Sequence, residues 1–214
     1  MRKIEGILLE PVGCLAEFPS APFHEIAVRL FGRKGKASKS GSRSYWHCLN
    51  LMEAAGRSLD DTKRRIRDLE CEAVAGATVY EDVAPALVEL RAMGVAVCLA
   101  SSLSRRAVRG FLGGHALEQL FSAVCDRDSA GGIKETPLTA ALRCASLQPE
   151  HAIFLTDTAE GLKVARRAGV HPVLMMNDPD EAQRLALQGP AGGIVSLHEL
   201  PDFMRLVRAQ NAEG

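Results

Sequence analysis

The stretch "HAIFLTDTAEGLKVARRAG", residues 151–169, contains a short apolar run followed by a helical pattern. The run is almost continuous in apolar residues, which is typical of a strand buried on both faces of a parallel sheet. The pattern after it ends in Ala-Gly, and glycine commonly ends a helix. A buried strand that passes directly into a helix predicts one unit of an α/β fold.

The same alternation of strand and helix patterns recurs from about residue 80 onward. Further strands are expected in "VAVCLASS", "FSAVCD", "HPVLMMND" and "GGIVSLHEL", and an N-terminal strand in "ILLEPV". We therefore predict an α/β fold with a Rossmann-like parallel sheet and helices on both of its faces. The interval after the first strand holds helical patterns and no convincing strand. We expect a core domain of residues 1–15 and 80–214 and an inserted helical domain of residues 16–79.

The charges of the 214-residue chain balance, with 26 basic and 26 acidic residues, and 47% of its residues are apolar. This composition is typical of a soluble globular protein and indicates no general attraction to nucleic acid or membranes. Glu5 and Glu10 interrupt the apolar N-terminal stretch, which favours a cytoplasmic protein without a signal peptide. The six cysteines are dispersed without a Cys-x-x-Cys pair, so we expect reduced and mostly buried thiols.

A basic segment, "GRKGKASKSGSRS" at residues 32–44, lies within the inserted domain. It carries lysines and arginines but no acidic residue, and its glycines and serines predict a flexible loop. Two interpretations stay open for this segment: a solvated loop between two helices, and a contact surface for an anionic ligand or partner.

Polar side chains follow four of the expected strands: Glu10, the pair Ser101 and Ser102, Lys134, and Asp157. Ligands of an open parallel sheet bind at the carboxyl ends of its strands, where these residues lie. Carboxylate oxygens bind Mg²⁺, whereas hydroxyl and ammonium groups hold phosphate oxygens. The pattern therefore indicates a site for phosphate and a divalent metal, with Mg²⁺ as the expected cofactor.

These segments resemble, in order and wording, the haloacid dehalogenase-like superfamily, especially its phosphatase and phosphoglucomutase-like branch with a helical cap. "LASSLS" resembles the second motif of that family, and "GIKETPLTAALRCASLQPEHAIFLTDTAEGLKVARRAGV" resembles its third and fourth motifs. The resemblance implies that Ser101 hydrogen-bonds a phosphoryl group, that Lys134 neutralises it and that Asp157 binds Mg²⁺. It also implies that the inserted helical domain is the cap.

The first motif is where the sequence departs from the family, which has Asp-x-Asp-Gly-Thr-Leu where this chain has "EPVGCL". Glu10 stands in the place of the nucleophilic Asp, and Val12 replaces the acid/base Asp. A glutamate carboxylate reaches about 1.5 Å farther than that of Asp, and a misplacement of about 1 Å can cost on the order of 100-fold in rate. Loss of an acid/base group removes a further factor of roughly 10² to 10⁴. The resemblance thus implies a strongly impaired phosphatase.

Each candidate residue also has an ordinary structural interpretation. Glu10 fits a metal ligand or a capping carboxylate, Lys134 fits a solvent-exposed side chain, and the two serines and Asp157 fit helix caps. Cys14 fits a small buried residue as well as a replacement nucleophile.

Two functions therefore stay open. One is a degenerate family member that binds a phosphorylated small molecule or a protein partner. The other is an active Mg²⁺-dependent phosphomonoester hydrolase, or a dehalogenase-like hydrolase, that uses Glu10.

Overall fold

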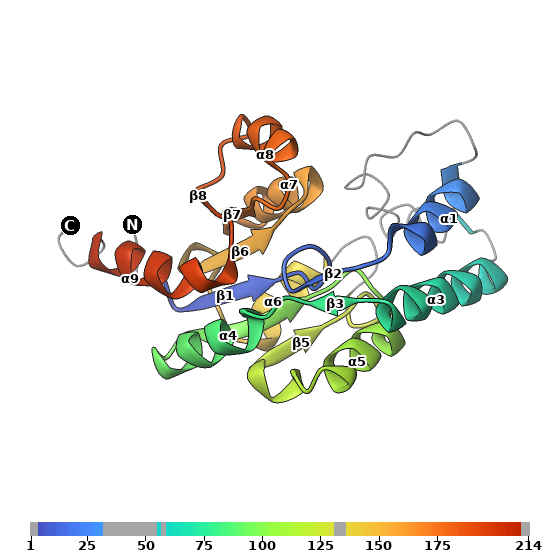
Figure 1. The fold of residues 1–214 in the computed structure, drawn as a ribbon, viewed down its shortest axis with the longest axis horizontal. Coiled ribbons are helices and arrows are strands. Elements are labelled where there is room, and N and C mark those ends of the chain that lie inside the picture. Colours follow the sequence, from blue (N-terminus) through green and yellow to red (C-terminus); the bar gives the residue numbers. More distant parts are fainter. Residues whose placement is uncertain (1–3, 32–54, 57–58, 131–135, 211–214) are drawn as a thin grey trace.

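A six-stranded parallel sheet forms the centre of the molecule (Figure 1). The computed structural model describes residues 4–31, 55–56, 59–130 and 136–210. The strand order is β5-β4-β1-β6-β7-β8, and every neighbouring pair is parallel. The strands are β1 (Gly6–Leu9), β4 (Ala96–Ala100), β5 (Ala123–Cys125), β6 (Ala152–Thr156), β7 (His171–Met175) and β8 (Gly192–Ile194). The predicted α/β fold is confirmed.

Helices cover both faces of this sheet. They are α4 (Val83–Ala92), α5 (Arg105–Gly114), α6 (Pro137–Cys144), α7 (Ala159–Ala168), α8 (Pro179–Ala186) and α9 (Leu200–Gln210). Short 3₁₀ helices occur at Glu118–Leu120, Pro149–His151 and Leu197–Glu199. The structure adds α8 to the elements expected from the sequence, since a helix of this length gives little periodic signal. No helix in the described ranges is both long and apolar enough to cross a bilayer.

The alternation of side chains along β1 explains why both faces are covered. Ile7 and Leu9 are fully buried in the larger apolar cluster, to which α4, α5 and α9 contribute. Leu8 points the other way, into a second cluster to which α6 and α7 contribute. Successive residues of a strand face opposite sides of the sheet, so a continuously apolar strand needs helices on both.

The segment between β1 and β4 contains helices and two very short strands. Helix α1 (Ser20–Phe31) packs against α3 (Asp60–Ala75), and α3 packs against α5. Figure 1 shows α1 and α3 side by side at one end of the molecule. Strands β2 (Ala16–Glu17) and β3 (Thr78–Val79) pair in antiparallel fashion at the two ends of the segment.

The expectation that this segment holds no strand is therefore wrong at its two ends. Two residues per strand are too few to show an alternating pattern in the sequence. The basic segment 32–44 lies outside the described residues, as does most of the helical pattern in residues 45–56. The division into core domain and inserted domain stays a prediction.

Candidate functional site

The carboxyl ends of the three central strands bring the first candidate residues together. Leu9 of β1 is in register with Leu99 of β4 and with Leu155 of β6. Glu10 therefore lies level with the ends of both neighbouring strands. Together with Ser101 and Ser102 it lines one small cavity of about 50 Å³, as the strand-end pattern in the sequence predicts.

The Glu10 carboxylate is held by a hydroxyl group of the neighbouring strand. The Thr156 hydroxyl donates a hydrogen bond of 2.5 Å to Oε2 of Glu10. Thr156 Oγ1 also lies 3.1 Å from Oγ1 of Thr158 and accepts a hydrogen bond of 3.3 Å from the Thr158 backbone N–H. Hydrogen bonds to ionised carboxylates are short and strong. One of the two carboxylate oxygens of Glu10 is thus already engaged within the protein.

The turn after Glu10 is fixed by its own backbone. Pro11 accepts hydrogen bonds from the N–H groups of Leu15 and Ala16, at 3.0 and 3.1 Å. Gly13 has a positive φ of 80°, a conformation that few other residues adopt at low cost, and its N–H donates to Ala16 at 2.9 Å. These contacts place Val12, a side chain without an acid/base group, at the border of the small cavity.

Ser101 and Ser102 belong to the loop between β4 and α5, here called the serine loop, and neither residue caps α5. Ser101 is buried, and its Oγ accepts a hydrogen bond of 3.1 Å from the N–H of Leu103. Ser104 occupies the N-cap position of α5, so the interpretation of Ser101 and Ser102 as helix caps is wrong. Both serines line the same cavity as Glu10.

Lys134 lies outside the described residues, but the helix that follows it is well defined. Thr136 caps α6: its hydroxyl accepts a hydrogen bond from the N–H of Thr139, and Thr139 bonds back to the N–H of Thr136. Pro137 occupies the first helical position, where its missing N–H has no cost. Residues of the first turns of α6 and of α7 both line the small cavity, while the N–H groups of Thr139 and Gly161 in these turns donate to the cap residues Thr136 and Thr158.

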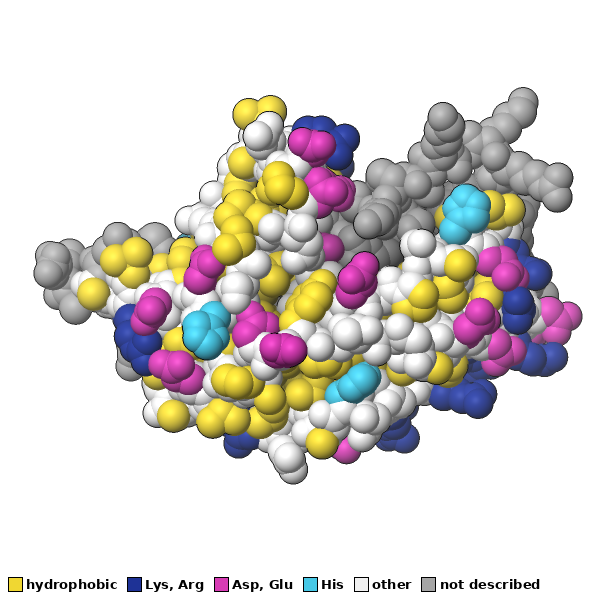
Figure 2. All heavy atoms as spheres, viewed as in Figure 1, with side chains coloured by type: hydrophobic (Ala, Val, Ile, Leu, Met, Phe, Trp, Pro, Cys, Tyr) yellow, Lys and Arg dark blue, Asp and Glu magenta, His cyan; other side chains and the backbone are white. Residues whose placement is uncertain are grey.

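Asp157 lines a different cavity from Glu10. This second cavity is a groove of about 970 Å³ that Val12 also borders. Its acidic lining residues are Glu17, Asp82, Asp157, Asp178 and Glu181, and none of the described lining residues is a lysine, arginine or histidine. Figure 2 shows acidic side chains across the middle of this face, with most lysines and arginines toward the rim. A groove with this charge favours cations over anions.

The N-cap of α7 is the residue after Asp157. The Thr158 hydroxyl accepts a hydrogen bond of 3.0 Å from the N–H of Gly161, so the interpretation of Asp157 as the cap is wrong. Gly161 itself is held close to Thr156: a Cβ at position 161 would lie 2.0 Å from Thr156 Oγ1. Thr156 therefore both binds Glu10 and excludes a side chain at position 161.

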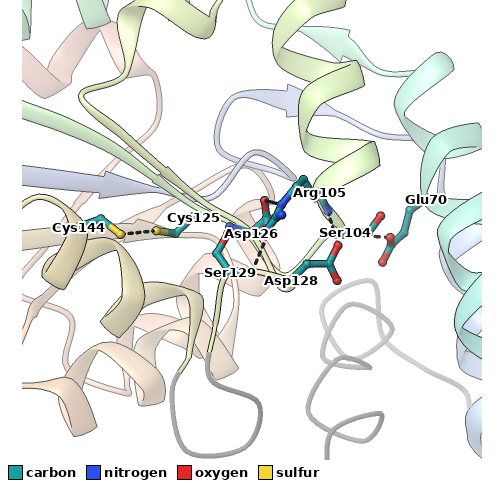
Figure 3. A network of polar contacts seen from close by, with 8 residues as sticks. All are labelled: Glu70, Ser104, Arg105, Cys125, Asp126, Asp128, Ser129 and Cys144. Carbon is teal, nitrogen blue, oxygen red and sulfur yellow. Dashed lines mark hydrogen bonds and ion pairs between the residues drawn. The ribbon is translucent and has the colours of Figure 1, made fainter.

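A buried ion pair that the sequence analysis missed contacts the loop of Ser101 to Ser104. Glu70 of α3 is fully buried, and Arg127, which follows β5, is almost so. Arg127 donates to both carboxylate oxygens of Glu70 and, at 3.1 Å, to the carbonyl of Ser102. The Ser104 N–H donates to Glu70 at 3.0 Å (Figure 3). The signal in the sequence that could have indicated a structural role for Arg127 was its position directly after the expected strand "FSAVCD".

The donor set at the strand ends suits a hard cation only in part. Glu10 and Asp157 supply carboxylate oxygens, which Mg²⁺ accepts, and Mg²⁺ commonly completes its shell with water and phosphate oxygens. The described residues contain no group of three histidine, cysteine or acidic side chains placed to hold a metal. Glu10 lines the small cavity and Asp157 the groove, and both cavities are bordered by Val12 and Phe23. Mg²⁺ binding stays a prediction, with Asp157 in the acidic groove as its better-placed ligand.

Comparisons with known proteins agree with this architecture. A family model described as haloacid dehalogenase-like hydrolase matches residues 39–175. Enolase-phosphatase E1 of Acidiphilium cryptum is 30% identical over 112 residues, which cover 51% of this chain and 48% of that protein. The match thus spans about half the length of that curated relative.

Solved structures match nearly the whole chain. A phosphonoacetaldehyde hydrolase like protein from Oleispira antarctica has a TM-score of 0.78 at 14% identity and covers 100% of this chain and 95% of its own. The β-phosphoglucomutase of Clostridium difficile has a TM-score of 0.70 at 12% identity, covering 99% and 100%. CbbY from Rhodobacter sphaeroides, solved with phosphate, has a TM-score of 0.66 at 20% identity, covering 92% and 96%. At these identities the likeness concerns the fold.

Proposed function

The chain belongs to the haloacid dehalogenase-like hydrolase family, and from this membership we infer that it is a degenerate member that binds a phosphorylated ligand and turns it over poorly or not at all. The hydrogen bond of 2.5 Å from Thr156 to Glu10 carries this inference. A carboxylate that is already held by a strong donor in the ground state is a weaker nucleophile, because attack requires that bond to lengthen. Its extra methylene also displaces it from the position of an aspartate.

The neighbouring position removes the second catalytic group. Val12 borders the cavity next to Glu10 and cannot protonate a leaving group or activate water. The backbone hydrogen bonds to Pro11 hold the turn in place, and the other carboxylate that lines this cavity is Glu160, at the start of α7. Impaired turnover follows from the chemistry of positions 10 and 12 together.

Binding has more support than turnover. Ser101 and Ser102 line the cavity beside the first turns of α6 and α7. Hydroxyl groups and the N–H groups of helix N-termini are the donors that proteins use for phosphate oxygens. A Mg²⁺ ion held by Asp157 would supply positive charge in the acid-lined groove, which adjoins the small cavity at Val12 and Phe23. A phosphorylated small molecule fits these donors. A phosphorylated partner protein would bind to them through its own phosphoryl group.

The alternative is an active phosphomonoester hydrolase that uses Glu10. The observation in its favour is that Glu10, Ser101 and Ser102 share one cavity, as an active site would require. A cytoplasmic location is part of either proposal, because both need a phosphorylated metabolite or protein as ligand.

Thermal melts test the binding proposal. Inorganic phosphate with Mg²⁺ at about ten times its dissociation constant should stabilise the folded protein by about 1.4 kcal/mol, a rise in Tm of roughly 3 to 6 °C for a chain of this size. Ser102→Ala should lose most of this rise. Ser122→Ala, an exposed serine at the far end of β5, is the matched control and should keep it. A wild-type Tm that phosphate leaves unchanged at millimolar concentrations would contradict the proposal.

A further inference from the structure

We propose that Cys125 and Cys144 are a modification site, at which a hydroperoxide produces a reversible disulfide. The two sulfur atoms lie 3.4 Å apart, with the Cys125 S–H directed at Cys144 (Figure 3). The inference is independent of the proposed function, because neither thiol lines either cavity.

The two cysteines come from different elements that the fold holds together. Cys125 is the last residue of β5 and Cys144 the last of α6, and α6 packs against β5. The sulfur atoms need to approach from 3.4 Å to about 2.0 Å to bond. That movement is within the reach of side-chain rotation at the end of a helix.

The exposure of the two thiols differs in a way that assigns their roles. Cys144 is exposed, whereas Cys125 is buried. Burial, together with the hydrogen bond to Cys144, raises the pKa of the Cys125 thiol to about 12. A dissolved oxidant therefore reaches the Cys144 thiol first. Cys125 is the buried, protonated thiol that then forms the disulfide with the oxidised Cys144.

The reaction balances in two steps. The Cys144 thiol loses its proton, the thiolate attacks a peroxide oxygen, and the O–O bond breaks. The leaving oxygen takes up the proton, so the products are Cys144 sulfenic acid and an alcohol or water. The Cys125 sulfur then attacks the Cys144 sulfur, the S–O bond breaks, and the Cys125 proton leaves with the hydroxyl as water. The peroxide is reduced and the two thiols are oxidised by two electrons. A thiol reductant reverses the change.

The bond would tie the end of the strand to the end of the helix across 19 positions of sequence. The disulfide would close a ring of the chain that contains Lys134 and Asp126. The Asp126 carboxylate accepts hydrogen bonds from Ser129 and forms an ion pair with Arg105. In reducing compartments such disulfides are transient and respond to oxidants. The sequence places Lys134, a phosphate-binding candidate, within the segment that this bond would constrain.

Mass spectrometry of the whole chain treated with one equivalent of hydrogen peroxide tests the proposal. The mass of the chain should fall by that of two hydrogen atoms, and the number of free thiols should fall from the six of the reduced chain to four. Dithiothreitol should restore the original mass and the six thiols. Trypsin cuts after Arg127 and Arg143, which puts Cys125 and Cys144 on separate peptides that only this disulfide would link.

Two variants separate this pair from the other thiols. Cys144→Ser, a change at an exposed position, should abolish the loss of two hydrogens. Cys71→Ser, which removes a half-exposed thiol on α3, should leave the linked peptide in place. The proposal is overturned if the wild type only gains oxygen atoms, if the first disulfide joins another pair of cysteines, or if Cys144→Ser still loses two hydrogens.

Discussion

Two glutamates of this protein, Glu10 and Glu70, are held in different ways. Glu70 is fully buried and paired with Arg127, with a further hydrogen bond from the Ser104 N–H. Glu10 is half-buried and receives a hydrogen bond from the neutral hydroxyl of Thr156. A buried carboxylate needs a cation to offset its desolvation, whereas one at a cavity wall does not.

This difference separates a structural carboxylate from a site carboxylate. The pair of Glu70 and Arg127 connects α3 with the loop after β5 and, through the Ser102 carbonyl, with the serine loop. The hydrogen bond from Thr156 to Glu10 connects the ends of β1 and β6, and Glu10 lines a cavity. We therefore expect substitution of Glu70 to act on stability and substitution of Glu10 to act on ligand chemistry.

Glu70→Ala should cause the largest loss of stability. It leaves Arg127 buried without its carboxylate, and breaking a buried pair in this way costs about 3 to 5 kcal/mol. For a chain of this size the Tm should fall by roughly 6 to 20 °C. Differential scanning calorimetry measures it, with Glu72→Ala, an exposed position on the same helix, as the control. Equal Tm values for the two variants would show that the pair contributes nothing.

Gly161→Ala should have an intermediate effect on the Glu10 side. The new Cβ would lie 2.0 Å from Thr156 Oγ1, so the hydroxyl has to move away from Glu10. Overpacking of this kind costs about 1 to 3 kcal/mol. The matched control is Gly113→Ala in α5, where a Cβ meets no atom within 4 Å and helix propensity favours alanine. Urea unfolding should show a loss for the first variant and none for the second; a neutral Gly161→Ala would mean that Thr156 has room to turn.

The smallest effect concerns the thiols near the end of β5. Burial raises the pKa of Cys98 to about 11, two units above its ordinary value, which alone cuts its thiolate fraction at pH 8 about 100-fold. Iodoacetamide should therefore label exposed Cys144 well before Cys98 and Cys125 in the native protein. Peptide mapping over time checks the order, and all thiols should react alike in urea. Early labelling of Cys98 would contradict the packing around β4.

The sequence predicted the sheet well because each strand and helix carries its own local pattern. It also predicted that Glu10, Ser101, Ser102, Lys134 and Asp157 gather at one edge of the sheet, since parallel strands end at a common edge. The first three line one cavity, Asp157 lines the neighbouring groove, and Lys134 lies outside the described residues. The sequence missed the role of Thr156, because a threonine at the end of a strand is common and only the fold brings its hydroxyl to Glu10. It missed Glu70 for a related reason: a charged residue on a helix predicts exposure, and only the fold brings Arg127 to it. Contacts between distant segments have no local signal.

The central claim is that Glu10 does not support turnover. Phosphate release from a panel of phosphomonoesters, with Mg²⁺ present, tests it most directly when the wild type is compared with Glu10→Ala purified in the same way. We predict equal, background-level rates for the two proteins, because Glu10 is engaged by Thr156 and Val12 supplies no acid/base group. A wild-type rate clearly above that of Glu10→Ala would contradict the account and make Glu10 a working catalytic residue.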